Sequence, residues 1–313
     1  MKALRIGTRG SALALWQARS MAEALRKISG HDPKLEPEIV IIKTSGDKFQ
    51  QTSFSQIGTK GIFIKELEDA LLDERIDLAV HSMKDVPTEL PGSLTIAAIG
   101  KREDVRDALL SSSGATLATL AQGARVGTSS LRRQSQLLYA RRDLRMLELR
   151  GNVDTRIEKL KRGDYDAIVL AKAGLDRLGL SGNISQALPH EVSLPAAGQG
   201  AIGIEARAGD AETLRVLSEL EDSETRAAVT AERAALAGLG GGCQVPIGAW
   251  GRVENGKLFL DVAVLSPDGT QRLWEKDSGL PEEAKAIGER IAKKLRAGGA
   301  AALLERESRG TRA

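Results

Sequence analysis

The chain has 313 residues, a formal net charge of +3, and a composition that is 42% hydrophobic and 28% charged. A chain of this length exceeds what one compact core usually supports, so we expect two or three domains. No apolar run approaches the roughly 18 residues that span a bilayer, which excludes a membrane protein. The small net charge and the 3% aromatic content argue against a nucleic-acid partner.

The first residues and the cysteine content indicate the compartment. Residues 1–6 enter a strand-like pattern without the apolar core and small-residue cleavage site of a secretory signal. The single cysteine, Cys243, cannot form an internal disulfide, which agrees with a reducing compartment. We therefore expect a cytoplasmic protein.

The first 100 residues alternate between strand and helix patterns. The periodicity predicts strands at 4–8, 38–43, 77–82 and 94–99 and helices at 11–28 and 62–75. A polar stretch at 44–61 contains three glycines and has no period. Because loops of that length usually serve a function, we interpret it as a mobile lid. The alternation predicts a parallel sheet.

A second alternating series follows the charged segment 100–106. It predicts strands near 107–111, 124–127, 144–149 and 166–171 and helices near 130–142, 152–163 and 173–178. The segment 195–200 indicates a return hinge, because the strand expected at 201–206 could rejoin the first sheet. From residue 222 an Ala-rich helix, a Gly-rich turn and hairpin signals at Asn255-Gly256 and 267–269 predict a small α+β domain.

The fold class that we expect is therefore α/β, with two lobes built on parallel-rich sheets and a small α+β C-terminal domain. The expected boundaries are 1–100 with 201–218 for domain 1, 106–194 for domain 2, and 222–313 for domain 3.

Basic residues follow the expected strands, where open α/β sheets bind ligands. They are Arg9, Lys84, Arg132, Arg133, Arg150, Arg156, Lys172 and Arg177. Hydroxyl groups and free backbone N–H groups at the helix start in 127–133 add an anion site, and Asn152 repeats the arrangement. Arginine binds planar carboxylates at two points, so the set predicts a cleft for a polycarboxylate. For any single arginine, a solvated surface charge is the commoner explanation.

Two other residues stand out as candidates for chemistry. Asp85 is the lone carboxylate among these cations, and its alternatives are an ion pair with Lys84 or a turn-capping role. Cys243 lies in a glycine-flanked loop that can present a thiol to a cleft, although a buried small hydrophobe is the alternative. His81 is expected to face the core. Three scattered histidines and one cysteine do not make a metal site.

Six ordered motifs resemble those of hydroxymethylbilane synthases (porphobilinogen deaminases). They are Thr8-Arg9-Gly10-Ser11, Ala79 to Asp85, Gly127 to Arg133, Leu149 to Val153, Leu194 to Gly200 and Gly241 to Pro246. The resemblance runs from Leu4 to at least Pro267, and six motifs are far more specific than a lone glycine pattern.

The resemblance implies that four porphobilinogens are added in turn to a dipyrromethane cofactor, each with loss of ammonia, before hydrolysis releases hydroxymethylbilane. The cofactor is joined by a thioether to Cys243. The resemblance also implies that the first two domains are similar to type II periplasmic-binding-protein lobes. We expect a monomer.

The resemblance also assigns roles to residues. For the catalytic carboxylate, Asp85 is the candidate that fits this chemistry, because an ionised carboxylate near the pyrrole nitrogen would stabilise the azafulvenium cation left by loss of ammonia. The cofactor carboxylates are held by Lys84, Ser130, Arg132, Arg133, Arg150 and Arg156, and the incoming substrate by Arg9, Ser11 and Arg177. Lys60 lies on the lid, where Gln56 replaces a lysine that many members have. A rival from another class is a two-lobed anion-binding or effector-sensing module without catalysis, which leaves Cys243 and the third domain unexplained.

Overall fold

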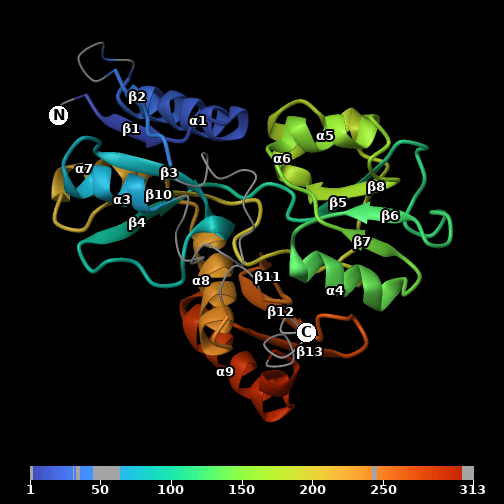
Figure 1. Ribbon diagram of the computed structural model, residues 1–313. Coiled ribbons are helices and arrows are strands. Elements are labelled where there is room, and N and C mark those ends of the chain that lie inside the picture. The colour runs from blue at the N-terminus through green and yellow to red at the C-terminus, as the bar shows by residue number, and fades with distance from the viewer. Residues whose placement is uncertain (1–2, 31, 33–35, 45–63, 242–244, 305–313) are drawn as a thin grey trace. The chain divides into compact units, whose positions relative to one another are not determined.

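The computed structural model describes residues 3–30, 32, 36–44, 64–241 and 245–304 (Figure 1). The chain divides into two compact units, one of residues 1–102 and 201–226 and one of residues 103–200 and 227–313. The chain therefore passes between the units three times, after residues 102, 200 and 226.

A five-stranded sheet in the order β2-β1-β3-β10-β4 forms the centre of the first unit. Its strands are β1 Arg5–Thr8, β2 Glu38–Ile41, β3 Leu78–Ser82, β4 Leu94–Ile99 and β10 Ile202–Arg207. Its helices are α1 Ala12–Ile28, α3 Lys65–Leu72 and α7 Ala211–Leu217. In β3, Leu78 and Val80 pack with α1, whereas Ala79 packs with α3. Because side chains alternate along a strand, the two helices cover opposite faces.

The first sheet is mixed rather than purely parallel. β1 pairs in parallel with β2 and β3, whereas β10 runs antiparallel to both β3 and β4. The segment expected at 201–206 thus rejoins the first sheet, but in the opposite direction, which periodicity alone cannot show.

The second unit contains a similar sheet in the order β7-β6-β8-β5-β9. Its strands are β5 Asp107–Ser111, β6 Arg125–Gly127, β7 Arg145–Leu147, β8 Ala167–Ala171 and β9 Gln186–Ala187. Its helices are α4 Leu131–Ala140, α5 Val153–Lys161 and α6 Lys172–Arg177. Here too three parallel strands are followed by an antiparallel strand, β5, and an edge strand. The two sheets thus repeat one arrangement, as the α/β prediction of two similar lobes requires.

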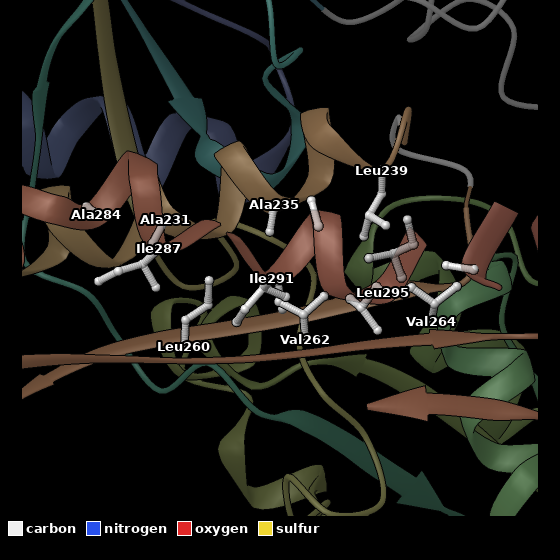
Figure 2. Close-up of a cluster of buried hydrophobic side chains, with 14 of the residues drawn as sticks. Ala231, Ala235, Leu239, Leu260, Val262, Val264, Ala284, Ile287, Ile291 and Leu295 are labelled. Carbon is white, nitrogen blue, oxygen red and sulfur yellow. The ribbon is translucent and has the colours of Figure 1, made fainter. Parts of the chain in front are cut away.

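A three-stranded antiparallel sheet completes the second unit. It consists of β11 Ile247–Glu254, β12 Lys257–Leu265 and β13 Arg272–Gly279. Its helices are α9 Ala284–Ala297 and α8 Ser223–Gly238, and α8 enters the second unit at Ala227. The hairpin predicted at Asn255-Gly256 is confirmed: both residues have positive φ, +52° and +72°, as a two-residue hairpin turn requires. Figure 2 shows Ile287, Ile291 and Leu295 beside the side chains of β12 in one apolar cluster.

Helices α8 and α9 approach each other closely at Gly288. A Cβ atom there would lie 2.3 Å from the carbonyl oxygen of Ala231 and 2.7 Å from the Cβ of Ala234. Since the nearest obstacle is backbone, the two helices would have to separate to admit a methyl group.

We expect Gly288→Ala to lower the free energy of unfolding by about 1–3 kcal/mol, as overpacking usually does. In an open helix the same change would add up to about 1 kcal/mol, because alanine favours helix. Gly182→Ala is the control, since no atom lies within 4 Å of the Cβ position there. Its stability should stay within about 0.5 kcal/mol of the parent. Urea unfolding measures both, and equal stabilities would contradict the close approach.

Among the described residues, no helix is both long and apolar enough to cross a membrane.

Candidate functional site

The ends of β1 and β3 carry four of the predicted site residues. β1 and β3 are parallel neighbours, so Arg9 and Ser11 follow one strand at the sheet edge where Lys84 and Asp85 follow the other. Ser11 begins α1, and its hydroxyl oxygen accepts a hydrogen bond of 3.3 Å from the N–H of Ala14. The side-chain amide of Gln17 donates a 2.9 Å hydrogen bond to the hydroxyl of Ser82, which ties α1 to the end of β3.

Asp85 is exposed between two buried neighbours. It ends the 3₁₀ turn Met83–Asp85, in which Met83 and the following Val86 are only 2% and 3% exposed. The N–H of Met83 donates to the carbonyl of Ala201, which fixes the turn to the chain before β10. Within the described part of the chain the Asp85 carboxylate accepts no hydrogen bond and forms no ion pair. The alternatives of a pair with Lys84 and of a turn cap therefore find no support.

His81 faces the core, as predicted. Its Nε2 lies 2.8 Å from a carboxylate oxygen of Glu205 on β10, and both side chains are buried. His81 and Glu205 thus form a buried polar pair inside the sheet.

In the second unit, the loop between β6 and α4 joins two strand ends. The hydroxyl of Ser129 donates to the carbonyl of Leu149 at 2.7 Å, and the N–H of Leu149 donates back to it at 3.2 Å. Ser130 is half-buried and begins α4, without a side-chain hydrogen bond to the helix. The hydroxyl that the sequence assigns to an anion site is therefore not used to cap the helix.

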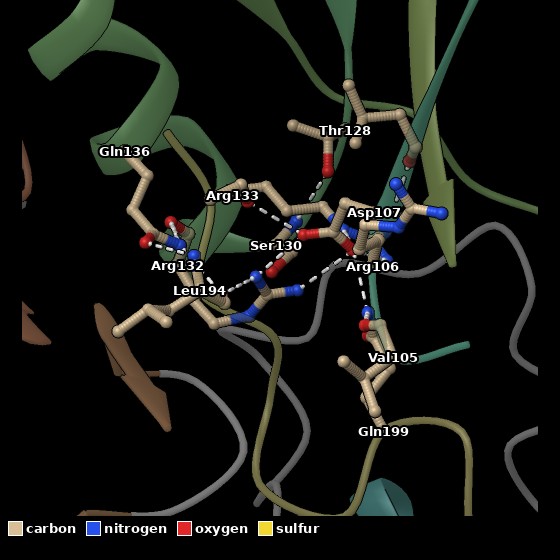
Figure 3. Close-up of polar contacts among 12 residues, drawn as sticks. Val105, Arg106, Asp107, Thr128, Ser130, Arg132, Arg133, Gln136, Leu194 and Gln199 are labelled. Carbon is tan, nitrogen blue, oxygen red and sulfur yellow. Dashed lines mark hydrogen bonds and ion pairs between the residues drawn. The ribbon is translucent and has the colours of Figure 1, made fainter. Parts of the chain in front are cut away.

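Arg132 and Arg133 converge on one buried carboxylate, that of Asp107 (Figure 3). One nitrogen of Arg132 lies 2.7 Å from Asp107 Oδ2, and Nε of Arg133 donates to Oδ1 at 2.9 Å. The hydroxyl of Ser193 and the side-chain amide of Gln199 also donate to Asp107, at 2.8 and 2.9 Å. We name these five residues the Asp107 cluster: Asp107, Arg132, Arg133, Ser193 and Gln199.

The Asp107 cluster has an excess of positive charge. It contains two guanidinium groups and one carboxylate, with exposures of 5%, 6% and 0%. Burial alone would raise the pKa of Asp107, but Arg132 and Arg133 outweigh that effect and hold the pKa well below its usual range. Burial lowers the pKa of Arg132, yet a guanidinium stays charged in proteins. One net positive charge is therefore held inside the unit, where an added anion is favoured.

The sequence assigns Arg132 and Arg133 to ligand carboxylates and does not foresee this internal pairing. Asp107 was missed because it follows a charged segment and looks like a solvated residue. The signal that would have found it is its place at the first position of a continuous apolar strand, Asp107–Ser111, where an aspartate must be buried with a partner.

Arg150 and Arg156 meet the turn that leads into α5. Nε of Arg156 donates to the carbonyl of Gly151 at 2.7 Å, and Nε of Arg150 donates to the exposed carboxylate of Glu148 at the same distance. Gly151 has a φ of +111°, and a Cβ there would lie 2.7 Å from Thr155 Cγ2. The turn that places both arginines therefore requires glycine.

We expect Gly151→Ala to lower the free energy of unfolding by more than about 2 kcal/mol, because strain and overpacking act together. Gly163 separates the two effects: it has a φ of +82° but no atom within 4 Å of the Cβ position. Gly163→Ala should cost only the backbone part, about 1–2 kcal/mol. A smaller loss for Gly151→Ala than for Gly163→Ala, by urea unfolding, would disagree with this account.

Arg177 is buried at the end of α6, where it donates to the carbonyl of Gly200 at 2.6 Å. Burial lowers its pKa. Lys172, one of the cations expected at the sheet edge, lies 2.6 Å from Asp176 and 3.6 Å from Asp104. Its charge is therefore balanced within the unit.

Cys243 lies outside the described residues. So do Lys60 and the rest of 45–61, the segment that the sequence analysis interprets as a lid. The chain on both sides of 242–244 is well anchored. Gly241 is buried and donates its N–H to the carbonyl of Leu236 at 3.0 Å, while the carbonyl of the buried Pro246 accepts from Leu265 at 3.0 Å.

The predicted site residues thus form a group on each unit. Arg9, Ser11, Lys84 and Asp85 belong to the first, and Ser130, Arg132, Arg133, Arg150, Arg156 and Arg177 to the second. Arg156 lies within α5 and Arg177 ends α6, whereas Ser130 directly precedes α4.

Comparisons with known proteins agree with the motifs. Residues 4–215 match the family described as "Porphobilinogen deaminase, dipyromethane cofactor binding domain", and residues 226–297 match "Porphobilinogen deaminase, C-terminal domain". Porphobilinogen deaminase of Moorella thermoacetica is 51% identical over 302 residues, 96% of each chain. That of Brevibacillus brevis is 50% identical over 301 residues, again 96% of each chain. Among solved structures, the BvgS periplasmic VFT2 domain of Bordetella pertussis is 14% identical, with a TM-score of 0.42, over 70% of this chain and 86% of its own. The matches over nearly the whole chain establish that it belongs to the porphobilinogen deaminase family.

Proposed function

We propose that this protein is a hydroxymethylbilane synthase, a transferase of tetrapyrrole biosynthesis that condenses four porphobilinogens and releases the linear tetrapyrrole by hydrolysis. The observation that carries the proposal is identity near 50% with porphobilinogen deaminases over 96% of the chain. The geometry of the described residues supports it, because a basic, partly buried set of side chains suits a substrate that carries acetate and propionate groups.

Asp85 is the proposed catalytic residue. Loss of ammonia from an aminomethylpyrrole leaves an azafulvenium cation, and a nearby carboxylate stabilises that developing charge. Asp85 lies at a strand end and has no partner in the described part of the chain, so its carboxylate is available to a substrate. The same group would assist departure of the amine and remove the ring proton after the carbon–carbon bond forms.

A dipyrromethane bound through Cys243 would supply the primer to which pyrroles are added. The Asp107 cluster suits such an acidic group, because its net positive charge is buried and its two guanidinium groups have N–H donors beyond those that bind Asp107. The residues proposed to hold its carboxylates are Lys84, Ser130, Arg132, Arg133, Arg150 and Arg156.

Substrate binding and organisation complete the proposal. Arg9, Ser11 and Arg177 would bind the incoming porphobilinogen, and Lys60 would act from the lid. The proposed domains are 1–100 with 201–218, 106–194 and 222–313. The enzyme is proposed to be a cytoplasmic monomer.

Incubation of the purified protein with porphobilinogen tests the function. We expect one ammonia per porphobilinogen consumed and a linear tetrapyrrole in the mass spectrum of the products. Binding of porphobilinogen without consumption would instead favour the anion-binding module.

A further inference from the structure

The Asp107 carboxylate uses both of its oxygens for side chains from three parts of the second unit. Oδ1 accepts from Arg133, Gln199 and, at 3.3 Å, Arg132, and Oδ2 accepts from Arg132 and Ser193. A carboxylate with two oxygens has about four lone-pair directions, so the donors of these four side chains satisfy it. The position of each donor therefore depends on the others, because a shift of the carboxylate disturbs them all.

Two of these donors belong to the connection that leaves the second unit before β10. Ser193 and Gln199 are the first and last residues of the segment 193–199, and only Gly200 follows Gln199 before the chain passes into the first unit. The same amide group of Gln199 also donates to the carbonyl of Val105 at 2.8 Å. Gln199 thus joins the outgoing connection to the incoming one, which starts at residue 103.

Further contacts fix these two connections in the second unit. The N–H of Glu103 donates to the carbonyl of Gly200 at 3.3 Å, and Arg177 donates to the same carbonyl. The carbonyl of Leu194 accepts from both Arg132 and Gln136. The arginine pair is therefore bonded to the connection directly as well as through Asp107.

We propose that Asp107 is a positioning residue that aligns Arg132 and Arg133 for a substrate-derived carboxylate and couples this alignment, through Gln199, to the segment 193–200. The inference rests on the proposed function for the identity of the carboxylate. Asp107 itself does not touch the ligand; it acts through the two guanidinium groups, whose directions it fixes.

Asp107→Asn and Gln199→Met, both made in the cofactor-loaded enzyme, test the two halves of the proposal. Asp107→Asn keeps the shape but removes the charge and turns one of the two acceptor oxygens into an N–H donor, which cannot bind an arginine. In chains that carry the cofactor, we expect KM for porphobilinogen to rise about tenfold or more, with a smaller change in kcat. One hydrogen bond to a charged group accounts for about that factor. A purely structural defect would instead reduce the active fraction and leave KM unchanged.

Gln199→Met removes the amide that joins Asp107 to Val105 and leaves the arginine pair on Asp107. We expect the backbone amides of 193–200 to exchange faster with deuterium than in the parent, because the segment loses its bond to Asp107 and Val105. This exchange is measured without substrate, so it reads the geometry even if porphobilinogen is not consumed. Failure of the proposed function and failure of this inference are thereby distinguished.

Asp261→Asn is the matched control. Asp261 is also a buried, ion-paired aspartate of the second unit, and it accepts from Arg252 and Trp274. This variant should lose stability but keep the parent's KM and its exchange in 193–200. A folded, cofactor-loaded Asp107→Asn enzyme with the parent's KM would overturn the proposal. If Asp107→Asn does not fold, unchanged exchange in Gln199→Met would overturn it.

Discussion

Turnover of porphobilinogen is expected to fall by about 10²- to 10³-fold when Asp85 is replaced by asparagine, the usual scale for losing one electrostatic stabiliser of a transition state. Asparagine has nearly the same shape but cannot supply negative charge or accept a proton. Because the Asp85 carboxylate has no partner in the described residues, the substitution should not disturb a buried network, and the fold should be retained. Steady-state kinetics and thermal unfolding of the purified variant measure the two effects separately.

Glu89→Gln is a matched control for this experiment. Glu89 is an exposed carboxylate four residues after Asp85, and the change removes the same charge from another exposed position. Its turnover should equal that of the parent. Turnover of Asp85→Asn within a few-fold of the parent, in protein that carries the cofactor, would contradict the catalytic role.

Replacing Cys243 with alanine is expected to abolish turnover, since the primer would have no attachment point. The parent chain should exceed its sequence mass by two pyrrole units in intact mass spectrometry, whereas the variant should have the mass of the bare chain. The rest of the fold should persist, because Gly241 and Pro246 on either side are held by their own hydrogen bonds.

Because the chain has a single cysteine, counting free thiols tests the attachment independently. Since the chain has no other thiol, the denatured parent should give no reaction with a thiol reagent if Cys243 carries a thioether. One reactive thiol per denatured chain, in fully active protein, would refute the attachment. Chemical reaction with Ehrlich's aldehyde should follow the same pattern, positive in the parent and negative in Cys243→Ala.

Much of the fold could be predicted because its strands are short apolar runs bounded by charge and glycine. Strand positions such as Leu94–Ile99 and Asp107–Ser111 agree with the sequence prediction. Helix α7 was missed because its seven residues give too few turns for a clear period, although Asp210 caps it by accepting from the N–H of Thr213. Strand β9 has only two residues and leaves no pattern at all.

The direction of the strands could not be predicted, and it determines part of the site. β5 runs antiparallel to β8, so its first residue, Asp107, pairs with Ala171 at the end of β8. This places a carboxylate at the edge where the sequence indicates only cations. The rule that ligands lie beyond carboxyl ends of strands therefore located the arginines but gave no sign of the aspartate that binds them.

The position of β10 between β3 and β4 in the first sheet determines the order in which the lobes can mature during synthesis. β3 and β4 each pair with β10, which ends at Arg207, whereas every strand of the second sheet has been made by Ala187. During synthesis, the sheet of the N-terminal lobe therefore stays incomplete, with the edges of β3 and β4 that bind β10 unpaired, until all strands of the second sheet have been made. Released chain fragments that end near residue 190 should accordingly protect the second sheet from protease but not the first, which reverses the usual N-to-C order of domain folding.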